Sequence, residues 1–158
     1  MKAVVRQAKT ADLVALAAVM RPADVAECLA AGFASPHEAL LESVGRSDWS
    51  ALVTLDGEPA ACLGVTDVSE SLLGPRRGRA WLLSGPAMGR RWRAAAVASR
   101  AVLAQVARHF DVLHAWVDAR HAVARRWLGW LGFLEVAESP LIPSGPVFLR
   151  VERWNHGR

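Results

Sequence analysis

Arginine is the residue type in this sequence that is best suited to bind a ligand. Lys2 and Lys9 are the only lysines among the 19 basic residues, and the formal net charge is +4. A guanidinium group binds phosphate or carboxylate through a planar fork of donors, so an anionic ligand is one interpretation. The other interpretation is compositional, because a GC-rich genome enriches a protein in both alanine and arginine.

The cysteines and histidines do not have the spacing of a metal site. Cys28 and Cys62 are the only cysteines, and the sequence contains no CxxC motif and no His-x-x-x-His pair. Cys28 lies in an apolar helical pattern and Cys62 in a strand pattern. We therefore expect two small core residues in a reducing compartment, and no metal.

The elements that must position these residues can be placed from turn and cap signals. Thr10 is predicted to cap a first helix, and Ser35 to cap another with Glu38 three residues later. Asp56 and Gly57 predict a hairpin between two β-prone runs. Strands are expected at residues 4–5, 50–55, 59–65, 79–84, 112–117, 133–137 and 148–153, with a long helix at 90–110 and another at 122–131.

The alternation of strand and helix in the second half predicts an α/β fold with one parallel strand pair. In the helix at 90–110, the inward face is expected to carry Ala94, Val97, Ala101, Ala104 and Val106. The length of 158 residues fits a single domain, residues 1–158. Residues 1–7 lack the apolar segment of a signal peptide, and no run reaches the length of a membrane span.

The segment from His121 to Phe133 carries the most specific pattern. Ala124 is small where a helix must approach the sheet, and Gly132 can take positive φ at the helix end. In this register the segment resembles the Gcn5-related N-acetyltransferase (GNAT) superfamily, which commonly shows Asn-x-x-Ala, then Tyr, then Gly-Phe. His121 stands at the Asn position and Leu128 at the Tyr position. The resemblance implies a GNAT-like mixed central sheet with helices on both faces.

Residues 21–27 and 81–84 are also similar to acetyltransferase-like phage proteins of the internal virion protein type. That similarity implies a location in the cytoplasm of a bacterial host or in a virion. It also implies protein–protein interaction with other phage structural proteins or with further copies of the chain. The seven tryptophans, among them Trp92, Trp127, Trp130 and Trp154, would suit such an interface, with core filling as the alternative.

The GNAT resemblance implies acetyl-CoA as the cofactor, bound at the turn before the long helix. The family uses a Gln/Arg-x-x-Gly-x-Gly/Ala turn whose backbone N–H groups bind pyrophosphate. Here Gly85 and Gly89 have a different spacing, and Pro86 removes one donor. The arginines of this stretch could compensate through their side chains, or could form a solvated basic turn. The residues assigned to the cofactor are Leu83, Met88, Gly89, Arg90, Arg91 and Arg93.

The same resemblance implies a catalytic base and an acid for the departing thiol. The usual acid is the tyrosine that Leu128 replaces, and the chain contains no tyrosine. The candidate bases are Asp118 and His121. The candidate acid in place of the tyrosine is Ser84, at the end of the strand at 79–84. The structural alternatives are a packed His121 and an ion pair between Asp118 and Arg120.

These features are compatible with three functions. The first is a phage-derived GNAT-like protein with weakened motifs, which acts as a virion-associated or accessory binding component. The second is an active acetyl-CoA-dependent N-acetyltransferase whose acceptor is an unknown small-molecule amine. Nucleic-acid binding through Arg76, Arg77, Arg79 and residues 90–93 is the third, and no recognised motif supports it.

Overall fold

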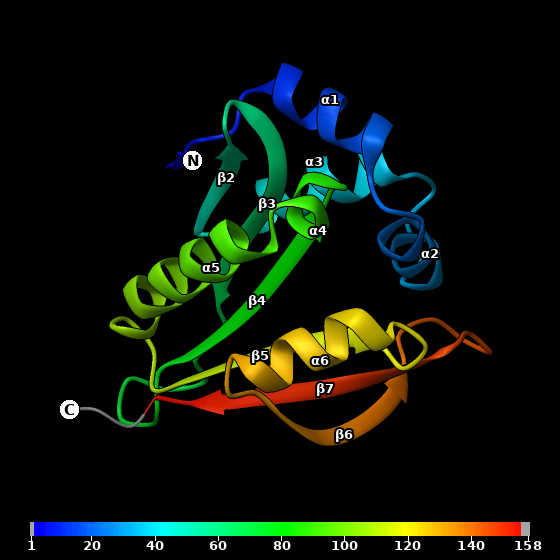
Figure 1. Cartoon of the computed structure of the whole chain (residues 1–158). Helices are drawn as coiled ribbons and strands as arrows, with labels where there is room; N and C mark the ends of the chain where they lie inside the picture. Colours follow the sequence, from blue (N-terminus) through cyan, green and yellow to red (C-terminus); the bar gives the residue numbers. More distant parts are fainter. Residues whose placement is uncertain (1, 156–158) are drawn as a thin grey trace.

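The computed structural model describes residues 2–155. Its helices and strands form a single mixed sheet in the order β1-β2-β3-β4-β5-β7-β6, in which β4 and β5 are parallel and the other neighbours are antiparallel. Figure 1 shows the sheet with the helices around it. The elements are β1 (Ala3–Arg6), α1 (Thr10–Val19), α2 (Pro22–Ala30), α3 (Pro36–Arg46), β2 (Trp49–Leu55), β3 (Glu58–Asp67), β4 (Arg77–Ser84), α4 (Ala87–Arg90), α5 (Trp92–Ala107), β5 (Val112–Asp118), α6 (Ala122–Trp130), β6 (Leu134–Pro140) and β7 (Val147–Trp154).

Most of the predicted turn and cap signals form as expected. The Ser35 hydroxyl accepts a hydrogen bond from the Glu38 amide at 3.1 Å, which caps α3. Asp56 and Gly57 both have positive φ, as a two-residue hairpin turn requires. The prediction for Thr10 was wrong, because Lys9 precedes α1 and its amide donates to a carboxylate of the first turn.

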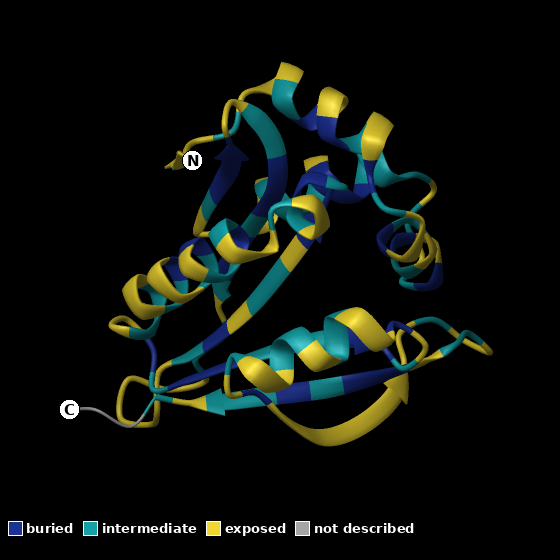
Figure 2. Cartoon of the chain, viewed as in Figure 1, coloured by how far each residue is buried: buried dark blue, intermediate teal, exposed yellow. Residues whose placement is uncertain are grey.

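The helices cover both faces of the sheet. Helices α1, α2 and α3 pack over one face of β2, β3 and β4, in a core that includes Leu16, Leu40 and Leu52. The other face of β2 and β3 is covered by α5, through Ala95 and Ala98. The end of α5 and part of α6, including Ala124 and Leu128, then cover β5 and β7. Figure 2 shows the buried centre of the sheet and the exposed edge strand β6.

The helix predicted at residues 90–110 is divided, and its inward face was wrong. Arg91 leaves helical geometry, with φ −120° and ψ 43°, and separates α4 from α5. Helix α5 buries Ala95, Ala98 and Val102, whereas Val97 is 71% exposed. Alanines lie on both faces of this helix, so the sequence contained too few large residues to fix its orientation.

Strands β4 and β5 pair only near their first residues and then diverge (Figure 1). The three pairs are Arg77–Val112, Gly78–Leu113 and Arg79–His114. A Cβ atom on Gly78 would lie 2.8 Å from Leu113 Cδ2, so glycine is required where the strands meet. The predicted parallel strand pair is thus formed by β4 and β5, and the divergence opens the middle of the sheet. No helix within residues 2–155 has the length and apolar character to span a bilayer.

Candidate active site

A cavity of about 620 Å³ lies between the diverging strands. Its size is typical of small-molecule sites. On the side of α5 and α6 its wall is apolar and includes Met88, Trp92, Ala95, Ala98, Ser99, Val123, Ala124, Trp127 and Leu128. On the side of α2 the wall carries charge, and it includes Arg21, Asp24 and Glu27. The cavity therefore joins an apolar compartment to a group of ionisable side chains.

Asp24 connects α2 to the ends of both diverging strands. Its Oδ2 accepts a hydrogen bond at 2.9 Å from the hydroxyl of Ser84, the last residue of β4. Its Oδ1 lies 3.1 Å from Nε2 of His121, which caps α6 just beyond β5. Arg21 also binds Oδ2, through Nε at 2.9 Å, and its backbone N–H donates to the Ser84 carbonyl. Both oxygens of this buried carboxylate therefore have hydrogen-bond partners.

His121 has a hydrogen-bonding role for each ring nitrogen. Nδ1 accepts from the Ala124 amide at 3.4 Å, which leaves Nε2 as the donor toward Asp24. The hydrogen bond to Asp24 raises the pKa of His121, although burial opposes this. Burial alone would raise the pKa of Asp24, but the contacts with His121 and Arg21 outweigh burial, so the pKa of Asp24 is lowered. Asp24 is therefore held ionised.

Glu27 lies one helical turn beyond Asp24 and faces the cavity. Its Oε2 accepts a hydrogen bond at 3.1 Å from the backbone N–H of Asp118. Desolvation raises the pKa of Glu27 to about 7, and the neighbouring charge of Asp24 acts in the same direction. A carboxylate with this pKa on a cavity wall has the properties of a general base near neutral pH.

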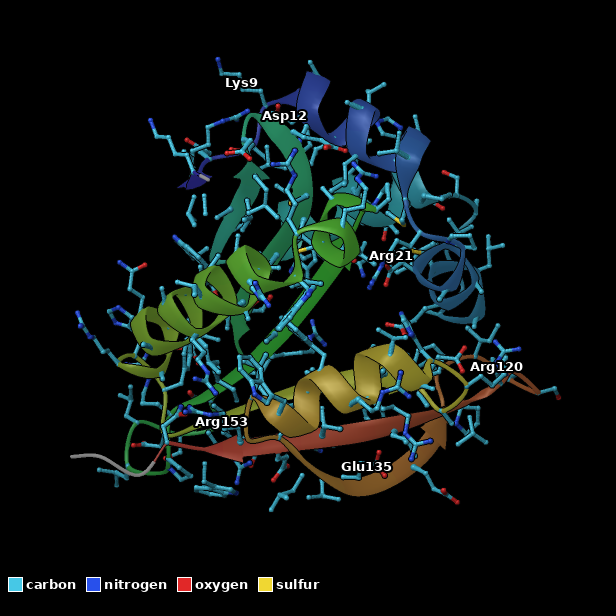
Figure 3. The ribbon with its side chains drawn as sticks, viewed as in Figure 1. Lys9, Asp12, Arg21, Arg120, Glu135 and Arg153 are labelled. Carbon is cyan, nitrogen blue, oxygen red and sulfur yellow. The ribbon has the colours of Figure 1, made fainter. Side chains whose placement is uncertain are left out.

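The three residues predicted to be catalytic come together around Asp24 and Glu27, but none of them lies on the cavity wall. Ser84 is fully buried and donates to Asp24. Asp118 is buried, and Arg120 binds it through Nε and Nη2, the latter at 2.7 Å. That contact lowers the pKa of Asp118, as expected of an ion pair rather than a base. Figure 3 labels Arg21 beside α2 and Arg120 in the turn before α6.

The backbone donors of the predicted cofactor turn are used within the chain. The amides of Met88, Gly89, Arg90 and Arg91 donate to carbonyls of residues 85–87, which forms α4. Among the arginines, Arg90 pairs with Glu58 at 2.5 Å, and Arg91 pairs with Asp56. Leu83 belongs to the core under α1 and α3 and also lines the cavity. The assignment of these residues to a cofactor stays a prediction.

A second set of donors lies one turn later, at the start of α5. Within residues 2–155, the amides of Trp92, Arg93 and Ala94 make no hydrogen bond to another part of the chain, because α5 begins there. The Arg93 guanidinium lies 5.2 Å from the Trp92 ring centroid and has no carboxylate partner among the described residues. This helix start is the stronger candidate for an anion site.

Trp127 contributes an unused donor to the cavity wall. Its Nε1 is buried and has no hydrogen-bond partner within residues 2–155. Its ring centroid lies 5.2 Å from that of Trp130, and Trp130 is the more exposed of the two. A buried indole N–H without a partner is costly, so it favours a ligand that carries an acceptor.

Sequence reasoning missed Asp24 and Glu27 as site residues. The signal that could have found them is the spacing of Arg21, Asp24 and Glu27, which places three charges on the helical face that also carries Cys28. Charged residues on a core-facing stripe need partners or a function. Within residues 2–155 no group of histidine, cysteine, aspartate and glutamate has the geometry to hold a metal ion.

This architecture, a mixed seven-stranded sheet that opens between two parallel strands, is the GNAT fold. Over 99% of its length the chain superimposes on a GNAT-family acetyltransferase from Bacillus anthracis, covering 97% of that chain at a TM-score of 0.73 and 10% identity. The ribosomal-protein-S18-alanine N-acetyltransferase from Escherichia coli matches with a TM-score of 0.69 and 16% identity, over 99% of this chain and 96% of that one.

A third similar structure is that of yncA from Salmonella typhimurium with its cofactor acetyl-CoA. It matches with a TM-score of 0.60 and 14% identity, over 99% of this chain and 95% of that one. No protein-family model and no curated protein matches the sequence. At these identities the similarity establishes the fold of the chain.

Proposed function

We propose that this chain is an acetyl-CoA-dependent N-acetyltransferase in which Glu27 removes a proton from the acceptor ammonium group. The observation that carries the proposal is the place of Glu27, on the wall of the cavity that opens between β4 and β5. Similar folds belong to a ribosomal-protein N-acetyltransferase and to yncA, which is described with its cofactor acetyl-CoA. A general base of this kind contributes about 10²–10⁴-fold to proton-transfer steps.

The residues of the cavity fit acetyl-CoA. Beyond Arg79 β4 makes no pair with β5, so apart from the Ser84 carbonyl, which accepts from Arg21, the backbone groups on this edge can bind an amide-bearing chain. The amides at the start of α5, with Arg93, suit the phosphates, and the Trp127 indole N–H suits a carbonyl oxygen. Acetyl-CoA supplies an acetyl group activated as a thioester.

The proton balance assigns a role to Glu27 and none to Leu128. Glu27 takes one proton from the ammonium group and so exposes the nitrogen lone pair. The new C–N bond then replaces the C–S bond, the sulfur leaves with the electron pair, and it takes the second proton of the amine. A thiol is acidic enough to leave as a thiolate, so the missing tyrosine slows this step without preventing it.

Asp24, His121 and Ser84 act as positioning residues in this proposal. Asp24 fixes α2 against the ends of β4 and β5, and its charge raises the pKa of Glu27, which makes Glu27 a stronger base. Ser84 and His121 fix the two oxygens of Asp24. Asp118 holds Glu27 through its backbone N–H rather than through its side chain.

Titration calorimetry with acetyl-CoA, followed by mass spectrometry of an amine panel, tests the proposal. We expect acetyl-CoA to bind and at least one amine to gain an acetyl group. We also expect Trp127→Phe, which keeps the ring and removes the donor, to lower kcat about 10-fold or more. An absence of binding at millimolar acetyl-CoA would contradict the proposal.

The second candidate is a binding component without turnover, such as the virion-associated accessory protein expected from the phage similarity. It is favoured by the engaged amides of residues 88–91 and by Leu128 at the position of the usual acid. Trp92 and Trp154 are 57% and 46% exposed, which suits an interface. None of the similar structures named above is described as a phage or virion protein. If the Glu27→Gln variant still bound every protein that the wild type binds, this candidate would be favoured.

A further inference from the structure

The cavity does not end at Glu27 but continues along one face of β4. Leu83, Trp81 and Arg79 alternate along the strand, so their side chains share one face, and all three line the cavity. From Leu83 to Arg79 this face is about 13 Å long, at roughly 3.3 Å per residue. We call this stretch of the cavity wall the groove, and Glu27 lies near its Leu83 end, where Asp24 of the same helix contacts Ser84.

Two tryptophans line the groove. Trp81 is fixed on the groove by its indole N–H, which donates to the Ser47 hydroxyl at 2.7 Å. Trp116 of β5 also lines the cavity and lies on the same face of the sheet as His114 and Arg79. The shape and lining suit an extended chain better than a compact molecule.

The end of the groove away from Glu27 is positively charged. Arg79 lines the cavity, is exposed, and has no acidic partner within residues 2–155. Arg46 lines the same region and shares its charge with Glu42 of α3. Burial lowers the pKa of the neighbouring His114 to about 4, and the charges of Arg150 and Arg79 add to this effect. The local potential therefore favours an anion.

We infer that the acceptor is the amino terminus of an extended peptide that carries an acidic side chain about four residues from its amine. The amine would meet Glu27, the chain would follow Leu83 and Trp81, and the acid would bind Arg79 through a charge-assisted hydrogen bond. This inference rests on the proposed function, because it treats Glu27 as the place of the amine.

Two amidated hexapeptides test the inference, Ala-Ala-Ala-Glu-Ala-Ala and Ala-Ala-Ala-Lys-Ala-Ala. Their dissociation constants are measured without acetyl-CoA, from the change in tryptophan fluorescence. We expect the glutamate peptide to bind at least 10-fold more tightly than the lysine peptide. Arg79→Glu should abolish or reverse this preference. Arg126→Glu is the matched control, because Arg126 is exposed on α6, lies outside the cavity and gives the same change in net charge.

The outcomes separate this inference from the proposed function. Equal affinities for the two peptides, no binding of either, or a preference that survives Arg79→Glu would overturn the inference. If the protein then still acetylates another amine with acetyl-CoA, the proposed function stands without this inference. If the glutamate peptide binds with the expected preference but gains no acetyl group, the acidic groove stands and the transferase proposal fails.

Discussion

Asp24 Oδ1 lies 3.1 Å from Nε2 of His121, although 97 residues separate the two in the chain. With the Ser84 hydroxyl on its other oxygen, Asp24 holds α2 across the open end of the gap between β4 and β5. The residues that close this gap are also those that place Glu27 on the cavity wall. Stability and the candidate chemistry therefore depend on the same contacts.

Replacing Asp24 with asparagine should destabilise the fold by about 3 kcal/mol, because it breaks a buried ion pair. Because the pKa of Asp24 is lowered in the folded state, its contribution to the free energy of unfolding is lost as the pH falls below about 4. Because the pKa of His121 is raised, its contribution is lost as the pH rises above about 6.5. The penalty should thus be largest between these values. Urea unfolding at pH 3, 5.5 and 8 measures it. Ser84→Ala, which removes one hydroxyl donor, should cost only about 1 kcal/mol; equal losses for both variants would count against the ion pair.

Replacing Glu27 with glutamine should stabilise the protein above pH 7. The pKa of Glu27 is raised from 4.5 to about 7 in the folded state. Folding therefore favours the protonated form, and stability is lost as the pH rises from about 4.5 past 7. Glutamine keeps the shape without the charge, so the gain should reach the order of 2 kcal/mol at pH 8 and vanish near pH 4.

Thermal melts of the wild type and of Glu27→Gln across this pH range check that expectation. Glu70→Gln is the control, because Glu70 lies exposed in the loop between β3 and β4. A gain that is the same at every pH would show that desolvation of Glu27 is not its cause.

Replacing Gly78 with alanine should cost about 1–3 kcal/mol. The new Cβ would lie 2.8 Å from Leu113 Cδ2 and 2.9 Å from Val65 Cγ2, at the point where β4 and β5 meet. Gly129→Ala in α6 is the matched control, since its Cβ meets no atom within 4 Å and alanine favours a helix. Chemical denaturation should show opposite signs for the two variants. If Gly78→Ala left the free energy of unfolding unchanged, β4 and β5 would be able to move further apart at this point.

Replacing Arg93 with glutamate should weaken acetyl-CoA binding at least 10-fold, because it places a negative charge at the helix start assigned to the phosphates. S-acetylpantetheine lacks those phosphates, so its affinity should not change. Calorimetry with both ligands separates the two cases. Equal loss of both affinities would indicate damage to the cavity itself.

The fold was largely predictable because its signals are local. Ser35 and Glu38 cap a helix within one turn, and Asp56 and Gly57 form a turn that few other residues allow. The motif from His121 to Phe133 gave the register of the strand and helix beside the cavity. The face of α5 was not predictable, because its alanines give no contrast between sides.

The site was only partly predictable because its residues meet through the tertiary fold. Ser84, Asp118 and His121 lie at or just beyond strand ends in the sequence, and in the structure they come together around Asp24 and Glu27. The carboxylates that reach the cavity, Asp24 and Glu27, come from a helix that contacts the strand ends only after folding. Their charges lie on a core-facing stripe that can be read from the residue spacing, but the position of the cavity depends on contacts between distant segments.

The rate of CoA release from acetyl-CoA, followed with a thiol reagent between pH 5.5 and 9, tests the role of Glu27 most directly. For any amine that the wild type acetylates, the rate should rise as the pH passes about 7, where Glu27 loses its proton. Glu27→Gln should lower kcat at least 100-fold and remove that rise, with little change in the affinity for acetyl-CoA. A Glu27→Gln variant that retains the wild-type rate and pH profile would contradict the account.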